Sequence, residues 1–148
     1  MFSLVVALML IFTLPTYIFA EEEAALTSDD TFTTYASNYF SGNTGTMNSL
    51  SGKESKIFNI SSGSTPTLSK VSSITLNVNV SNGSLPFYLN VKNPDGIVVQ
   101  HYITGTGSKS VTLTEFNDTN PQGTWKVSIT STGLVSTATA SMKVNYTY

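Results

Sequence analysis

Apolar and polar residues alternate along most of the second half of the chain. The alternating segments are 74–80, 87–92, 125–130 and 137–148, and shorter or more continuous apolar runs occur at 58–60, 97–103 and 111–113. A period of two places every second side chain on the same face of a strand. The pattern therefore predicts about seven strands, most of them with one buried face.

The residues between these segments are typical of tight turns. Asn82-Gly83 suits a hairpin turn that needs a positive φ, and Asn93-Pro94-Asp95-Gly96 has proline where a type I turn prefers it. The other turn sequences are Asn120-Pro121-Gln122-Gly123, Gly105-Thr106-Gly107 and Thr132-Gly133. Short strands joined by such turns predict a mainly β fold, an antiparallel β-sandwich of jelly-roll or immunoglobulin-like kind. We assign residues 56–148 to this β-sandwich head.

The N-terminal part follows a different pattern, because residues 2–20 contain no charged side chain. As a helix with a rise of about 1.5 Å per residue, this segment would reach roughly 28 Å, close to the thickness of a bilayer's hydrocarbon layer. Glu21, Glu22 and Glu23 follow it. So large an apolar surface must be buried, and the residues that we expect to form an assembly helix are Leu4, Val5, Leu8, Leu10, Ile11, Phe12, Leu14, Ile18 and Phe19.

A helical spacing continues beyond the glutamates. The residues at the intervals of one helix face are Phe32, Tyr35, Ala36, Tyr39 and Phe40. We therefore predict a hydrophobic helix over residues 1–40, kinked at Pro15, and a linker rich in glycine, serine and threonine over 41–55. Two alternatives stay open: the aromatic residues belong to a first strand, or to a separate short helix capped by Ser28 or Asp29.

Three interpretations of residues 1–20 compete. A cleaved signal peptide would end at Ala20, but the usual basic residues are missing from its start. An uncleaved membrane anchor would lack the flanking lysine or arginine that orients such a segment. In the third interpretation the segment is retained and packs against its equivalents in a polymer.

Composition narrows the classes of function. The chain has 148 residues, of which 11% are charged, with a net charge of −2 and no cysteine; all seven of its cationic residues are lysines. Without arginine and without a positive field, we expect no binding to nucleic acid. The absence of cysteine excludes disulfides and thiolate metal sites.

Few residues suggest catalysis or metal binding. His101 and Asp95 could contribute to a catalytic triad, but the sequence has no nucleophile motif to complete it. Glu115 with Asp118, and Asn93 with Asp95, offer too few oxygens for the six to eight that Ca²⁺ takes. We predict that the protein is not an enzyme and has no catalytic residues, metal or cofactor.

Five N-x-S/T sequons are candidate sites for covalently attached glycans. Because Asn79 and Asn145 are predicted on outward strand faces, and Asn82 and Asn117 near turns, glycosylation would be sterically allowed on an exported protein. The five asparagines are Asn59, Asn79, Asn82, Asn117 and Asn145.

Two resemblances bear on the fold and the function. The segment from Leu89 to Gly96, with its Asn-Pro-Asp-Gly turn, and the later Gly123-Thr124-Trp125 strand resemble the pre-peptidase C-terminal and P-type β-sandwich modules of secreted proteases. The layout of an apolar helix before a Ser/Thr-rich β head is similar to archaeal type IV pilins and related surface filament proteins. Bacterial pilins differ, because they carry glutamate at the fifth mature position, where this chain has Val5.

These observations lead to one main hypothesis and its alternatives. The second resemblance implies a structural subunit of an extracellular, cell-surface filament, a homopolymer that resides in the membrane before assembly. The alternative is a secreted or membrane-anchored β-sandwich binding module, with residues 1–20 as signal peptide or anchor. In a variant of it, an extended segment from Asp30 to Phe40 would polymerise the protein by inserting as a strand into a neighbour's sheet.

Overall fold

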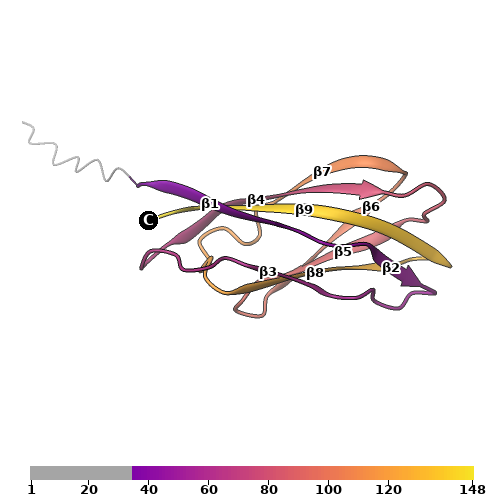
Figure 1. The fold of residues 1–148 in the computed structure, drawn as a ribbon, viewed down its shortest axis with the longest axis horizontal. Helices are drawn as coiled ribbons and strands as arrows, with labels where there is room; N and C mark the ends of the chain where they lie inside the picture. The colour runs from indigo at the N-terminus through magenta and orange to yellow at the C-terminus, as the bar shows by residue number, and fades with distance from the viewer. Residues whose placement is uncertain (1–34) are drawn as a thin grey trace, which may run out of the picture. The chain divides into compact units, whose positions relative to one another are not determined.

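The computed structural model describes residues 35–148, which fold into two antiparallel β-sheets (Figure 1). The first sheet has the order β1-β9-β4-β7, with β2 also paired to β9; its strands are β1 (Ser37–Asn43), β2 (Met47–Leu50), β4 (Lys70–Val80), β7 (Gly107–Leu113) and β9 (Val135–Thr147). The second sheet has the order β3-β8-β5-β6; its strands are β3 (Phe58–Ser61), β5 (Phe87–Lys92), β6 (Val98–Ile103) and β8 (Thr124–Ser131). The predicted mainly β, antiparallel fold is confirmed for these residues, none of which is helical.

The core lies between the two sheets and follows the predicted alternation. On β4 the side chains of Ile74, Leu76, Val78 and Val80 are buried, while Asn77 and Asn79 between them are exposed. Strand β9 repeats this pattern at the center of the first sheet, hydrogen-bonded to β4 on one side and to β1 and β2 on the other. The side chains of both sheets meet in one hydrophobic cluster, as expected of a sandwich.

Trp125 on β8 is the largest side chain of this core. It is fully buried, and its indole Nε1 donates a hydrogen bond of 3.0 Å to the carbonyl of Pro121. Phe116 packs edge-on against the ring at 5.2 Å between centroids, and Phe40 approaches it at 6.4 Å. The turn before β8 thus satisfies the one polar atom of the tryptophan, as buried indoles require.

The first strands differ from the predicted boundaries. Strand β1 replaces the end of the predicted helix over 1–40, and β2 lies inside the predicted linker over 41–55. Both pair with β9, and Glu54 forms a further isolated bridge with Thr130. The open alternative of a first strand is therefore correct for residues 37–43. The same pairing takes Ser37 to Phe40, part of the segment proposed for strand donation, into the sheet of its own chain.

Buried serines join the strands at one end of the head. The hydroxyl of Ser49 accepts the Ser131 N–H at 2.7 Å and donates to the Lys53 carbonyl. Ser136 donates to the Leu85 carbonyl at 2.7 Å and also lies within hydrogen-bond distance of the Ser131 hydroxyl. All three serines are buried, so these hydroxyls satisfy backbone groups that water does not reach.

The variant Ser49→Ala tests this network. We expect it to lower the free energy of unfolding by about 1–3 kcal/mol, because the buried Ser131 N–H loses its acceptor. Urea denaturation followed by far-UV circular dichroism measures the change. The matched control is Ser110→Ala on the exposed side of β7, which should change it by less than about 0.5 kcal/mol. Equal stability of the two variants would contradict the role given to Ser49.

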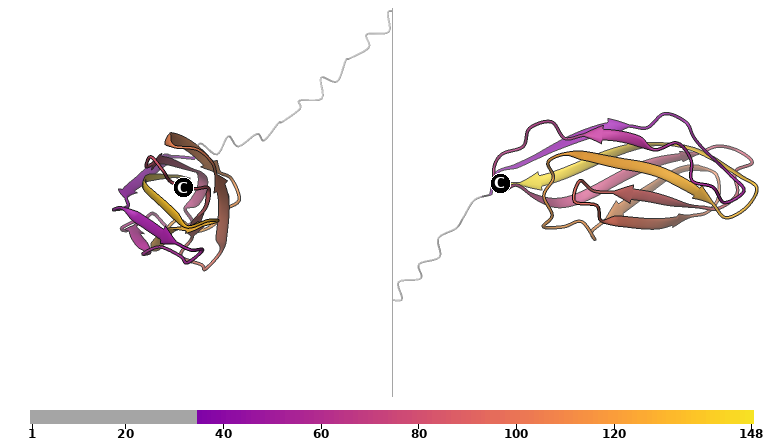
Figure 2. Two further views of the ribbon diagram at one scale, coloured as in Figure 1. Left: turned by 90° about the vertical axis from the view of Figure 1, so that its right-hand side faces the viewer. Right: turned by 90° about the horizontal axis from the view of Figure 1, so that it is seen from below.

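The two ends of the described chain lie together at one pole of the head. Ala36 and Tyr148 exchange backbone hydrogen bonds of 3.1 and 3.0 Å, and Figures 1 and 2 show the C-terminus beside the start of β1. The connection from β8 to β9 and the end of β2 form the opposite pole. Residues 1–34, with the predicted assembly helix and Pro15, lie outside the described residues. Among residues 35–148 no helix is long and apolar enough to span a membrane.

Candidate functional site

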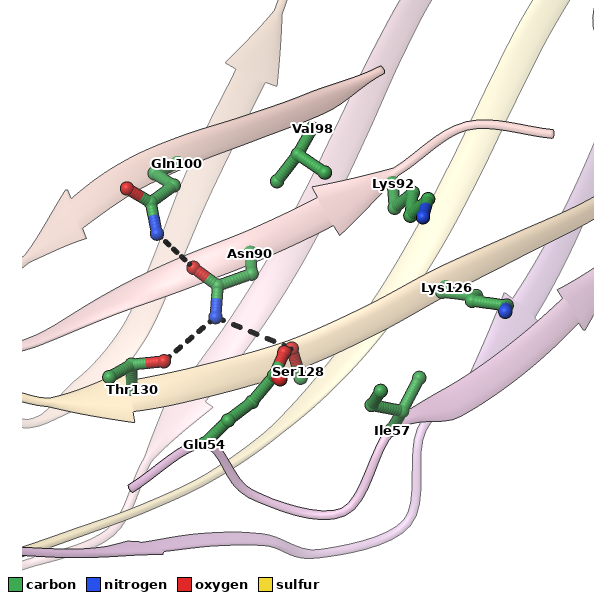
Figure 3. Close-up of a pocket in the computed structure, with 9 residues that line it drawn as sticks. All are labelled: Glu54, Ile57, Asn90, Lys92, Val98, Gln100, Lys126, Ser128 and Thr130. Atoms are coloured by element: carbon green, nitrogen blue, oxygen red, sulfur yellow. Dashed lines mark hydrogen bonds between the residues drawn. The ribbon is translucent and has the colours of Figure 1, made fainter. Parts of the chain in front are cut away.

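A hollow of about 400 Å³ lies on the outer face of the second sheet (Figure 3). Small-molecule sites in proteins are commonly of this size or larger. Strands β5, β6 and β8 form most of it, and the segment between β2 and β3 adds one side. Its lining residues are Glu54, Ile57, Asn90, Lys92, Val98, Gln100, Lys126, Ser128 and Thr130.

Strand register brings these residues together. Asn90 is directly opposite Gln100 of β6 and Ser128 of β8, and Lys92 is opposite Val98 and Lys126. Since residues opposite each other in antiparallel strands project to the same face, these side chains form rows across the sheet. Leu89 and Val91, which alternate with these residues along β5, are buried in the core. The hollow therefore lies on the opposite, outer side of the same sheet.

A hydrogen-bonded network forms the floor of the hollow. Gln100 Nε2 donates to Asn90 Oδ1 at 2.9 Å, and Asn90 Nδ2 donates to Thr130 Oγ1 at 2.9 Å and to Ser128 Oγ at 3.4 Å. Ser128 in turn donates to a carboxylate oxygen of Glu54. Asn90 and Ser128 are buried, so the network holds their polar groups in fixed orientations beneath the more exposed rim (Figure 3).

Two pairs of side chains with different chemistry lie on either side of the polar floor, along strands β5, β6 and β8. Tyr88 and Tyr102, two residues before Asn90 and two after Gln100, are opposite each other in register, with ring centroids 5.2 Å apart. They are 41% and 50% exposed. On the other side of the floor, Lys92 of β5 and Lys126 of β8 are opposite each other in register, and both line the hollow (Figure 3). An aromatic pair and a cationic pair therefore flank the polar floor.

The residues considered for catalysis and for Ca²⁺ are dispersed. His101 is exposed on β6. Glu115 accepts the N–H of its neighbour Thr114 through Oε2, and Asn93 Oδ1 accepts the Ile97 N–H at the predicted Asn-Pro-Asp-Gly turn. Within residues 35–148 no cluster of three or more histidine and carboxylate side chains could hold a metal ion.

The sequon asparagines fall into two groups. Asn59, Asn79, Asn82 and Asn117 are exposed. Asn145 is half-buried in the middle of the first sheet, and its Nδ2 donates to Ser73 Oγ at 3.0 Å. A glycan on Asn145 would replace one of the two Nδ2 hydrogens at a half-buried position that already holds this bond, whereas the other four side chains are exposed.

The sequence predicted none of the lining residues as a site. Lys92, Asn90 and Lys126 could be assigned to outward faces from the alternation, but their mutual distances depend on which strands are neighbours. The apolar residues predicted for assembly, from Leu4 to Phe19, lie outside the described residues. The structure therefore adds one candidate site and leaves the assembly helix as a prediction.

Comparison with known proteins supports the fold. No protein-family description matches the sequence, and no curated protein matches it either. Among solved structures the chain is similar to FLHE, with 12% identity, a TM-score of 0.52, and coverage of 77% of this chain and 98% of that chain. It is also similar to a protein of Bacillus endospore appendages described as disulfide-linked pili, with 15% identity, a TM-score of 0.47, and coverage of 76% and 89%. At such low identity the first likeness shows a shared β fold alone, and the second is too distant to carry an argument.

Proposed function

We propose that this protein is a structural subunit of a cell-surface filament, assembled through its apolar N-terminal segment and displaying the β-sandwich head. The observation that carries the proposal is the uncharged, apolar stretch of residues 2–20 beside a head that supplies a core of its own. At about 25 cal/mol per Å² of apolar surface, such a stretch is too costly to leave in water. Packing against its equivalents in other copies would bury it after it leaves the membrane.

The geometry of the head is consistent with this role. The chain enters the sandwich at the pole where Ala36 pairs with Tyr148. Within residues 35–148 the strands build both sheets and one shared core, so the described head does not draw on the N-terminal segment for its fold.

The main alternative is a β-sandwich binding module that is secreted or anchored by residues 1–20. The hollow between the tyrosine pair and the lysine pair favours a binding role of this kind. The two functions differ in the fate of the N-terminal segment: the filament needs it retained, and a secreted module needs it removed. In either case we propose an extracellular location and no enzymatic activity.

The native N-terminus distinguishes the two. We expect mass spectrometry of the protein taken from its source cells to find residues 2–20 still attached, and electron microscopy of the same material to show filaments. A soluble, monodisperse protein that begins at Glu21 would overturn the filament proposal and support the secreted module. An intact chain found only as membrane-bound monomer would overturn it as well.

A further inference from the structure

The tyrosine pair offers a partly exposed aromatic surface next to the hollow. Tyr88 and Tyr102 lie on adjacent strands with their rings tilted by 46°. Tyr88 is also opposite Thr130 of β8, whose hydroxyl belongs to the floor of the hollow. An apolar surface directly joined to fixed hydrogen-bonding groups suits a ligand that has both an apolar face and many hydroxyls. A pyranose ring has both.

The polar floor is suited to the same ligand. Amide and hydroxyl groups of Asn90, Gln100 and Thr130 both donate and accept hydrogen bonds, and the network in Figure 3 fixes their orientation. Because these groups are already ordered, a bound sugar would lose little free energy to the ordering of side chains. From Tyr88 to Lys92 the strand extends roughly 13 Å at about 3.3 Å per residue, which is long enough for a short oligosaccharide.

The lysine pair indicates the charge of the ligand. Lys92 and Lys126 are directly opposite each other on β5 and β8, and like charges in this position destabilise a strand pair. Glu54, the carboxylate that lines the hollow, already accepts a hydrogen bond from Ser128. An anionic group placed between the two ammonium groups would relieve their repulsion.

We propose that the outer face of the second sheet binds an acidic oligosaccharide. One pyranose ring packs on Tyr88 and Tyr102, sugar hydroxyls bind the floor around Asn90, and a carboxylate of the sugar chain lies between Lys92 and Lys126. This binding site goes beyond a role in filament structure, and it would give a displayed head the ability to attach to a polysaccharide surface. It does not depend on whether the protein polymerises.

Isothermal titration calorimetry on the full chain tests the proposal. The chain is held monomeric in a non-ionic detergent without a sugar headgroup, so that the assay is independent of assembly. The probes are tetragalacturonate, a hyaluronan tetrasaccharide and the neutral tetrasaccharide maltotetraose. We expect at least one acidic probe to bind at least tenfold more tightly than maltotetraose, and its affinity to fall as salt concentration rises.

Two sets of variants locate the site. Tyr88→Ala and Tyr102→Ala should each weaken binding of the acidic probe at least tenfold. Lys92→Ala combined with Lys126→Ala should remove the preference over maltotetraose and the dependence on salt. The matched control is Tyr39→Ala with Lys143→Ala on the outer face of the first sheet, where the ammonium lies 4.0 Å from the ring centroid; it should bind as the wild type does.

Three results would overturn the proposal. They are no detectable binding of any of the three probes at millimolar concentration, equal binding of acidic and neutral probes, or unchanged binding by the tyrosine and lysine variants. Far-UV circular dichroism and melting temperature of each variant confirm that it is folded. All four substituted side chains at the site are exposed, so a loss of binding without a loss of structure is the expected combination.

Discussion

Purified protein with aspartate in place of both Leu8 and Leu10 is expected to stay monomeric under conditions in which the wild-type chain polymerises. Both positions lie within the uncharged stretch that the filament proposal buries between copies. Aspartate at the center of an apolar helix costs about 2.5–3.5 kcal/mol per residue on the scale measured for membrane insertion. Two such changes should raise the concentration needed for assembly at least hundredfold, since each 1.4 kcal/mol corresponds to a factor of ten.

Polymerisation of the purified protein is started by removing the detergent. Because no cells are involved, a defect in export cannot be mistaken for a defect in assembly. Sedimentation and negative-stain microscopy then report the fraction of polymer. The variant Leu8→Ile with Leu10→Ile keeps the apolar surface and should polymerise normally. Leu68→Asp places the same charge on the head, where that leucine is 84% exposed, and should also polymerise. Normal filaments from the double aspartate variant would show that residues 2–20 do not form the core of the polymer.

The central strands could be predicted from the sequence because each has one buried face. From Ile74 on β4 and from Ala138 on β9 every second side chain enters the core, so apolar and polar residues alternate along these segments. Trp125, Val127 and Ile129 on β8 follow the same rule. The turns were equally predictable, since Gly83 and Gly96 adopt the positive φ that their turn sequences require.

The predicted helix over 1–40 includes residues 37–40, which instead begin strand β1, because a strand at the edge of a sheet lacks a clear alternation. Most residues of β1 are exposed on both faces, so no alternation marks it as a strand. Its inward positions include Gly42, where a Cβ would lie 2.6 Å from Ile60 Cγ2. A glycine is needed for this close approach, and it removes an apolar residue from the pattern. The spacing of Tyr35, Tyr39 and Phe40 then resembled one face of a helix.

The buried serines and the candidate site could not be predicted for a related reason. Hydropathy assigns serine to solvent, yet Ser49 and Ser136 are fully buried because their hydroxyls complete backbone hydrogen bonds between distant segments. The hollow likewise depends on β8 lying between β3 and β5, an order that the sequence does not reveal. Period-two patterning gives the face of a residue but not its neighbours across the sheet.

The variant Trp125→Ala is expected to lose about 3–5 kcal/mol of unfolding free energy, the range measured for tryptophan or phenylalanine removed from a core. The ring is fully buried and contacts Phe116 from a loop and Phe40 from β1, so its removal leaves a cavity lined by three separate segments. It also leaves the Pro121 carbonyl without its donor. Since the total free energy of unfolding of a domain of this size is about 5–15 kcal/mol, the variant should melt roughly 15–25 °C below the wild type.

Thermal denaturation followed by far-UV circular dichroism measures this loss without depending on tryptophan fluorescence. The control Trp125→Phe keeps an aromatic ring against Phe116 but loses the hydrogen bond to Pro121. Its loss of unfolding free energy should therefore be less than half of the loss caused by Trp125→Ala. Tyr39→Ala, at a residue 56% exposed, should change the melting temperature little. If Trp125→Ala unfolded within about 1 kcal/mol of the wild type, Trp125 would not be the residue that couples β1, β8 and the turn at Pro121, and the core would have to be centered elsewhere.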